Sequence, residues 1–192
     1  MAFCKNEITI LIYEIKKRRK IMLKKEIYDL LNAQINKELF SAYLYLDISN
    51  HYIDKGLMGF GHWYDVQAME EKDHAYLMKQ YIQNNGESVV LEMIKKPSVD
   101  YKTLRTGIEE SLAHERYISN SINHIYEKAL ELNDYKTVEF LNWFIKEQVE
   151  EEKNAEDLLK QYDMFASDGK GLYMMDKDLL ARVYAAPSLV LD

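Results

Sequence analysis

Four glutamates constrain this chain more than any other feature, because each lies on the apolar stripe of a predicted helix. Reading the sequence in alternating steps of three and four residues keeps side chains on one face of a helix. Four such stripes occur, at residues 27–48, 60–82, 104–125 and 141–162. Each stripe carries one glutamate near its middle, and these are Glu38, Glu71, Glu115 and Glu151.

An ionised carboxylate that moves from water into an apolar interior loses, even after relaxation, on the order of several kcal/mol. Four buried carboxylates, one from each helix, would unfold a bundle unless something cationic lay between them. A pair of divalent metal ions is the most economical solution. The alternative is a buried network of carboxylate–histidine hydrogen bonds without metal, which so much negative charge disfavours.

The composition is that of one ordinary globular domain without nucleic-acid or membrane partners. The 192 residues are 47% hydrophobic and 30% charged, and only seven Gly and two Pro occur, which favours an all-helical fold. The net charge of −7 argues against a nucleic-acid partner. A single cysteine excludes an internal disulfide and a four-cysteine metal site. The chain lacks an apolar run of about 18 residues, so we expect a cytoplasmic protein without a membrane span.

The first 21 residues differ from the rest of the chain. Their apolar run at 8–13 is too short for the core of a signal peptide, and the basic block at 16–20 follows it rather than preceding it. We interpret the basic block as a solvated charge run rather than a nuclear address. The sequence therefore predicts that Met22 is the original start and that 1–21 is an upstream extension of unassigned role.

The periodicity predicts four long helices and one short helix. The long helices are expected at about 24–54, 59–84, 101–131 and 135–165, and they form one bundle domain over 22–165. The remainder, 166–192, is expected to hold a flexible joint at 167–171, a short fifth helix at about 174–185 and a tail.

The segment between the second and third helices determines the topology. A helix of about 28 residues is about 42 Å long, at 1.5 Å per residue. An extended connection of about 15 residues reaches about 50 Å and can run the whole length of the bundle. The second and third helices are then parallel. The sequence thus predicts an all-α four-helix bundle with one long crossover connection and a short C-terminal fifth helix.

An internal repeat relates the two helical hairpins. Glu38 and Glu71 are 33 residues apart, and so are Glu115 and Gln148. Three positions after the second member of each pair comes one more candidate ligand, and these two are His74 and Glu151. Pairing the hairpins brings all six side chains to one level of the core.

Several short strings at these positions carry a family resemblance. They are Asn36–Leu39, Glu70–His74, His114–Glu115, Trp143–Lys153 and Gly171–Tyr173. With these strings and spacings, the chain from Met22 to about Leu180 resembles the ferritins, and most closely the non-haem bacterial and archaeal type.

The resemblance implies a di-iron site inside the bundle. Glu38 and His74 would bind the first iron, and Glu71 would bridge the two irons. The second iron would be bound by Glu115 together with Gln148 or Glu151, between which the sequence does not choose. Carboxylate and imidazole ligands suit iron, and two adjacent Fe(II) ions can reduce O₂ by two electrons.

Three further features refine this expectation. Lys72 stands where the haem-binding bacterioferritins have a methionine, so we expect no haem. Tyr45, two turns after Glu38, is expected either to hydrogen-bond a ligand or supply an electron, or to be a plain core tyrosine. By resemblance a third iron would bind beside the pair, and its ligands would be Glu70, Glu147 and Glu150. The alternative is that these three glutamates form a solvated acidic face.

The function expected from this resemblance is iron storage. Fe(II) would be oxidised by O₂ at the di-iron site, and ferric oxyhydroxide would collect inside a homo-oligomeric shell of 24 subunits. One alternative is a di-iron peroxidase or oxygenase that retains its metals. The other is a structural helical bundle without enzymatic activity. The sequence does not give the physiological oxidant or the reductant that releases iron.

Overall fold

The computed structural model describes residues 23–191, and all regular secondary structure in that range is helical. The N-terminal extension predicted at 1–21, including Cys4, lies outside the described residues. Within them, no helix is both long and apolar enough to cross a bilayer. The helices are α2 (Lys25–Asp54), α3 (Met58–Asn84), α4 (Leu104–Glu131), α5 (Tyr135–Phe165) and α6 (Gly169–Leu179).

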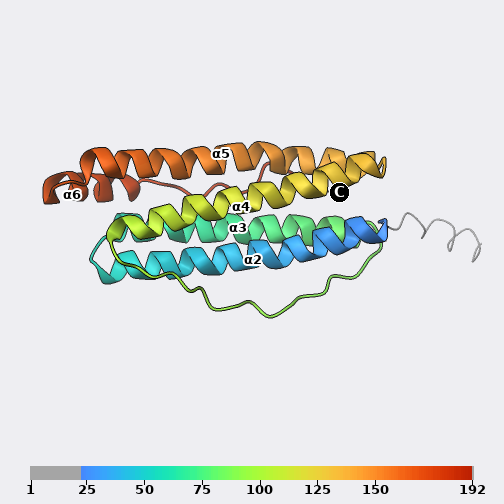
Figure 1. Ribbon diagram of the computed structural model, residues 1–192, viewed down its shortest axis with the longest axis horizontal. Helices are drawn as coiled ribbons and strands as arrows, with labels where there is room; N and C mark the ends of the chain where they lie inside the picture. Colours follow the sequence, from blue (N-terminus) through green and yellow to red (C-terminus); the bar gives the residue numbers. More distant parts are fainter. Residues whose placement is uncertain (1–22, 192) are drawn as a thin grey trace, which may run out of the picture.

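Two helical hairpins form the bundle. Helix α2 packs mainly against α3, and α4 mainly against α5, while α2 and α4 join the two hairpins. The connection at 85–103 runs along the outside of the bundle from one end to the other, so that α3 and α4 point the same way (Figure 1). The prediction of an all-α bundle with a long crossover is confirmed.

Two asparagines of α2 hold the crossover segment in place. The side chain of Asn32 accepts from the backbone N–H of Val90 (2.8 Å) and donates to its carbonyl (2.9 Å). Asn36 accepts from the N–H of Glu92 at 2.8 Å. An extended segment with no strand partner has to find other hydrogen-bond partners for its backbone groups. These asparagine side chains supply the hydrogen bonds that a neighbouring strand would otherwise make.

The buried core is apolar towards its two ends and polar in its middle. One apolar cluster includes Ile27, Ile82, Ile122 and Phe144, and the other includes Tyr52, Phe60, Ile108 and Leu158. The layer between the two clusters is built from buried polar side chains. These are Gln34, Glu38, Ser41, Gln67, Glu71, His74, Ser111, Glu115, Ser119, Gln148 and Glu151.

The fifth helix was placed about five residues too late by the sequence. The predicted joint at 167–171 is in fact the start of α6, which ends at Leu179 rather than near 185. Asp168 caps this helix, since its carboxylate accepts from the N–H groups of Lys170 (2.8 Å) and Gly171 (2.9 Å). The glycines suggested flexibility, but the capping aspartate organises them into a first turn.

Helix α6 docks against the start of α3 through a second aspartate. The carboxylate of Asp176 accepts from the N–H groups of Gly59 (2.7 Å) and Phe60 (3.1 Å), so it caps α3 from another helix. Gly59 permits the approach, because a Cβ atom there would lie 1.6 Å from the carbonyl oxygen of Asp176. Capping carboxylates also interact favourably with the helix dipole.

We expect Gly59→Ala to push α6 away from α3 and to break the cap. The overpacking and the lost hydrogen bonds together should lower the free energy of unfolding by about 2 kcal/mol. Denaturant unfolding measures this value. Gly169→Ala is the matched control, because a Cβ atom at Gly169 meets no heavy atom within 4 Å. Equal stability of the two variants would contradict the docking role of Gly59.

Candidate metal centre

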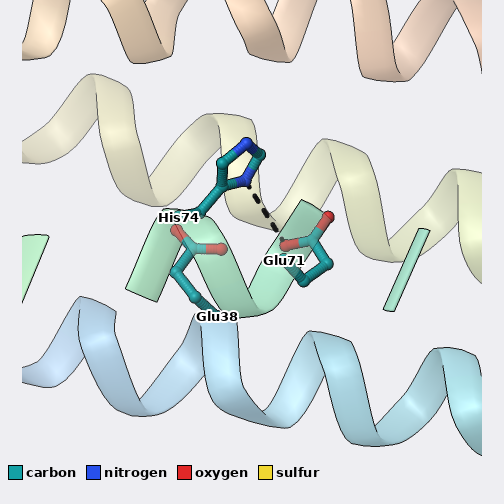
Figure 2. A group of neighbouring side chains, drawn as sticks. All are labelled: Glu38, Glu71 and His74. Carbon is teal, nitrogen blue, oxygen red and sulfur yellow. Dashed lines mark ion pairs between the residues drawn. The ribbon is translucent and has the colours of Figure 1, made fainter. Parts of the chain in front are cut away.

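Three side chains from α2 and α3 converge in the polar layer. Glu38, Glu71 and His74 each offer one ligand atom, and these atoms all lie within 4.8 Å of one another. Figure 2 shows the two carboxylates and the imidazole facing one another between the helices. His74 Nδ1 lies 3.7 Å from a carboxylate oxygen of Glu71, and none of the three residues is more than 3% exposed.

The converging atoms lack hydrogen-bond partners. Oε2 of Glu38, Oε2 of Glu71 and Nδ1 of His74 are all buried without a partner within the described chain. A buried polar atom that is left unpaired lowers stability by about 1–3 kcal/mol, and more if the group is charged. Three such atoms in one place match the donor set of a metal ion, which would satisfy all of them at once.

A glutamine one turn earlier orients Glu38. Gln34 Nε2 donates to Oε1 of Glu38 at 2.8 Å, which leaves Oε2 as the free oxygen. The amide oxygen of Gln34 in turn accepts from Ser121 Oγ at 2.5 Å. This connection to α4 fixes both the glutamine and the carboxylate rotamer.

The other three candidate ligands are hydrogen-bonded rather than free. Oε1 of Glu115 accepts from the hydroxyl of Tyr45, and Oε2 accepts from Gln148 Nε2 at 3.2 Å. Oε2 of Glu151 accepts from Gln67 Nε2 at 2.5 Å. We call the half of the polar layer formed by Glu115, Gln148 and Glu151 the closed half, because internal hydrogen bonds occupy its ligand atoms. The half formed by Glu38, Glu71 and His74 is the open half, because it has ligand atoms without partners. Tyr45 therefore contacts a candidate ligand.

Burial shifts the protonation of all four central acids. It raises the pKa of Glu38 to about 8, with a further rise from the charge of Glu71. It also raises the pKa of Glu151 to about 8 and that of Glu115 to about 7. The pKa of Glu71 is raised well above its ordinary value by burial and then by Glu115 and Glu151. The metal-free centre thus holds protons at neutral pH, and a cation would displace them.

The acids predicted for a third site line a cavity beside this centre. Glu70 of α3 and Glu147 and Glu150 of α5 line a space of about 240 Å³, which His74 and Glu151 also border. Burial raises the pKa of Glu70 and of Glu147. The three acids thus share one concave surface, on which Glu150 is exposed.

Sequence reasoning missed three residues that shape the centre. Gln34 precedes Glu38 by four residues on the same stripe, and this spacing could have identified it as an orienting side chain. Gln67 instead donates to Glu151 of α5, a contact that its spacing from Glu71 does not reveal. Arg182 also lines the acidic cavity and forms an ion pair with Glu70, with an N···O distance of 2.5 Å. The two residues are 112 positions apart, and no sequence signal connects them.

Comparisons with known proteins agree on one family. A family profile described as a ferritin-like domain matches residues 28–165. The chain is 37% identical to a probable bacterial non-heme ferritin-like protein of Haemophilus influenzae over 158 residues, which cover 82% of this chain and 96% of that protein. It is also 37% identical to a bacterial non-heme ferritin of Campylobacter jejuni over 156 residues, covering 81% and 93%.

Solved structures give the same result. An engineered closed form of the Archaeoglobus fulgidus ferritin superimposes with a TM-score of 0.83 at 32% identity, over 85% of this chain and 99% of that one. The open-pore ferritin of the same archaeon superimposes with a TM-score of 0.82 at 33% identity, over 84% and 98%.

The raised carboxyl pKa values predict an unusual dependence of stability on pH for the metal-free protein. The folded state keeps protons that the unfolded state, with glutamate pKa values near 4.5, has already released. The free energy of unfolding should therefore fall as pH rises from about 5 to 8, by up to about 1.4 kcal/mol per pH unit for each such carboxyl. Denaturant titrations at several pH values measure the slope.

The glutamine variant Glu38→Gln should flatten this slope and stabilise the metal-free protein at pH 8, because it removes one group that must ionise in the core. The exposed Glu127 provides the control, and Glu127→Gln should leave the slope as it is. A metal-free protein that gains stability between pH 5 and 8 would contradict the assignment of these acids.

Proposed function

This chain belongs to the ferritin family, an iron-storage family of helical bundles, and we propose that it is a ferroxidase. It would oxidise Fe(II) with O₂ in the polar layer and store the ferric product inside a homo-oligomeric shell of 24 subunits in the cytoplasm. One observation above all supports the proposal. Three buried ligand atoms without hydrogen-bond partners lie within 4.8 Å of one another. The other three candidate ligands, Glu115, Gln148 and Glu151, lie in the same polar layer.

The two halves of the polar layer suit two steps of one process. In the open half, Glu38, Glu71 and His74 would bind the first Fe(II), because their free atoms need no rearrangement. In the closed half, Glu115 would bind the second Fe(II) with Gln148 or Glu151 after exchanging the hydrogen bonds from Tyr45 and Gln148. Two Fe(II) ions held side by side supply two electrons to O₂.

Protons move together with iron in this proposal. The centre holds protons at neutral pH because burial raises the carboxyl pKa values. Each Fe(II) that binds would release protons from the glutamates, and this release preserves the charge balance of the buried layer. Tyr45 would hold Glu115 through its hydroxyl hydrogen bond only until the second Fe(II) displaces it. No haem takes part in this scheme, because Lys72 occupies the position of the methionine ligand.

A di-iron oxidoreductase that retains its metals is the second candidate. The internal hydrogen bonds of Glu115 and Gln148 argue for storage instead, because a second metal that has to displace them would be bound less tightly. Iron that is bound weakly can move on after oxidation. The assembly state separates these functions too, since storage requires an enclosed space.

The first test is the initial rate of aerobic Fe(II) oxidation, followed by ultraviolet absorbance. Glu71→Ala should slow oxidation at least about tenfold, because it removes the proposed bridging ligand. Glu127→Ala, an exposed change on α4, should leave the rate unchanged. Equal rates for the parent protein and Glu71→Ala would end the ferroxidase proposal and leave the helical scaffold without this chemistry.

The second test is iron capacity. After repeated additions of Fe(II) in air and gel filtration, the protein should retain many more iron atoms per chain than its own ligands can bind. Electron microscopy of the same fraction should reveal a hollow shell with a dense core. Retention of two irons per chain, without a mineral core, would favour the oxidoreductase with fixed metals.

A further inference from the structure

The chain beyond α6 forms a C-terminal strap, residues 180–191, that returns along the bundle over the face formed by α3 and α5 (Figure 1). Several contacts fasten it, and one of them joins His62 Nε2 to the backbone carbonyl of Arg182 at 2.8 Å. The hydroxyl of Tyr184 donates to the carboxylate of Asp73. Trp143 Nε1 donates to the hydroxyl of Ser188 at 2.9 Å, and Gln80 Nε2 donates to the carbonyl of Leu191 at 2.9 Å. The strap therefore has a defined docking site and is not a loose tail.

Arg182 is the charged anchor of the strap. Its Nη2 donates to Oε2 of Glu70 at 2.5 Å, and its Nη1 donates to the carbonyl of Trp63 at 3.2 Å. The guanidinium lies 4.2 Å from the centre of the Trp63 indole, within the range of a cation–π interaction. Only 18% of the Arg182 side chain and 17% of the Glu70 side chain are exposed, so solvent screens this ion pair only partly.

The strap also forms one wall of the acidic cavity. Residues 185–188 of the strap border the space on one side, and the carboxylates of Glu70, Glu147, Glu150 and Glu151 border the other. Among the described residues that line it, Arg182 is the only lysine or arginine. His74 lines the cavity as well, and its Nδ1 is buried without a hydrogen-bond partner. The cavity is thus continuous with the centre and carries an excess of negative charge.

We infer that Arg182 is a built-in competitor of the metal ion in this cavity, and that a divalent cation bound to Glu70 releases the C-terminal strap. The inference rests on the proposed function, because it concerns the glutamates of the proposed third iron site. Oε2 of Glu70 accepts from the guanidinium, so a metal that binds both oxygens of Glu70 has to displace Arg182. A metal that binds Oε1 alone still lies next to the positive charge of the guanidinium. Two cations in one small cavity also repel each other.

Competition of this kind has a reciprocal consequence. If the metal weakens strap docking, then strap docking weakens metal binding by the same factor. The docked strap would therefore keep the third site free until Fe(II) is abundant, and the bound metal would remove the wall formed by residues 185–188. The cavity would then open towards the space beyond the face formed by α3 and α5.

Zinc titration tests the competition without oxidation chemistry. Zn(II) is redox-inert, and calorimetry in a Glu71→Gln background weakens the competing buried centre by removing one of its ligands, while every ligand of the acidic cavity stays in place. Adding Arg182→Gln should tighten Zn(II) binding about tenfold, a factor typical of coupled sites. The matched control is Arg116→Gln, which removes one positive charge and one ion pair, with Glu156, on an exposed surface of α4 and α5. An unchanged or weaker affinity in Arg182→Gln would overturn the inference.

Hydrogen–deuterium exchange of the strap tests the release. In the full-length protein, saturating Zn(II) should increase deuterium uptake over residues 183–191. In Arg182→Gln the uptake should already be high without metal and should change little with Zn(II). Uptake that stays constant or falls when Zn(II) binds the full-length protein would contradict the release.

The two proposals fail separately. Equal Fe(II) oxidation rates for the parent protein and Glu71→Ala, combined with Zn(II)-driven strap release, would reject the ferroxidase and keep the competition. Fast Fe(II) oxidation that Glu71→Ala slows, together with deuterium uptake in the strap that Zn(II) does not change, would keep the ferroxidase and reject the competition.

Discussion

The repulsion among buried carboxylates is the constraint around which the bundle is organised. Glu38, Glu71, Glu115 and Glu151 lie in one layer with almost no exposure, and burial raises the pKa of all four carboxyls, to about 8 for Glu38 and Glu151 and to about 7 for Glu115. Such a layer is stable only if protons, hydrogen-bond donors or metal ions balance its charge. The structure provides donors for one half and leaves the other half for a cation.

The two glutamines explain how a rigid site can still have free ligand atoms. Gln34 binds Oε1 of Glu38 and leaves its Oε2 without a partner, while Gln67 binds Oε2 of Glu151 across the bundle. They lie at equivalent positions of the two stripes formed by α2 and α3, one helical turn before Glu38 and Glu71. A site oriented in this way loses little conformational entropy when the metal binds, because the rotamers are already fixed.

Much of this arrangement could be predicted from the sequence because it depends on helical periodicity. The stripes placed the six candidate ligands in one layer, and the length of the 85–103 segment gave the parallel order of α3 and α4. The predicted start of α6 was wrong because the glycines near Gly169 indicate a flexible joint, whereas Asp168 caps a helix there. Arg182 could not be foreseen, because its contact with Glu70 depends on the path of a segment without regular structure.

The separation of the core into two apolar clusters makes the scaffold independent of its cargo. Zinc fingers fold around their ion and unfold when it leaves. Here the clusters on either side of the polar layer, one around Ile122 and Phe144 and the other around Tyr52 and Phe60, hold the helices together by themselves. If the polar layer binds iron as proposed, the ion can enter and leave without refolding of the helices, which a reservoir needs each time that supply and demand change.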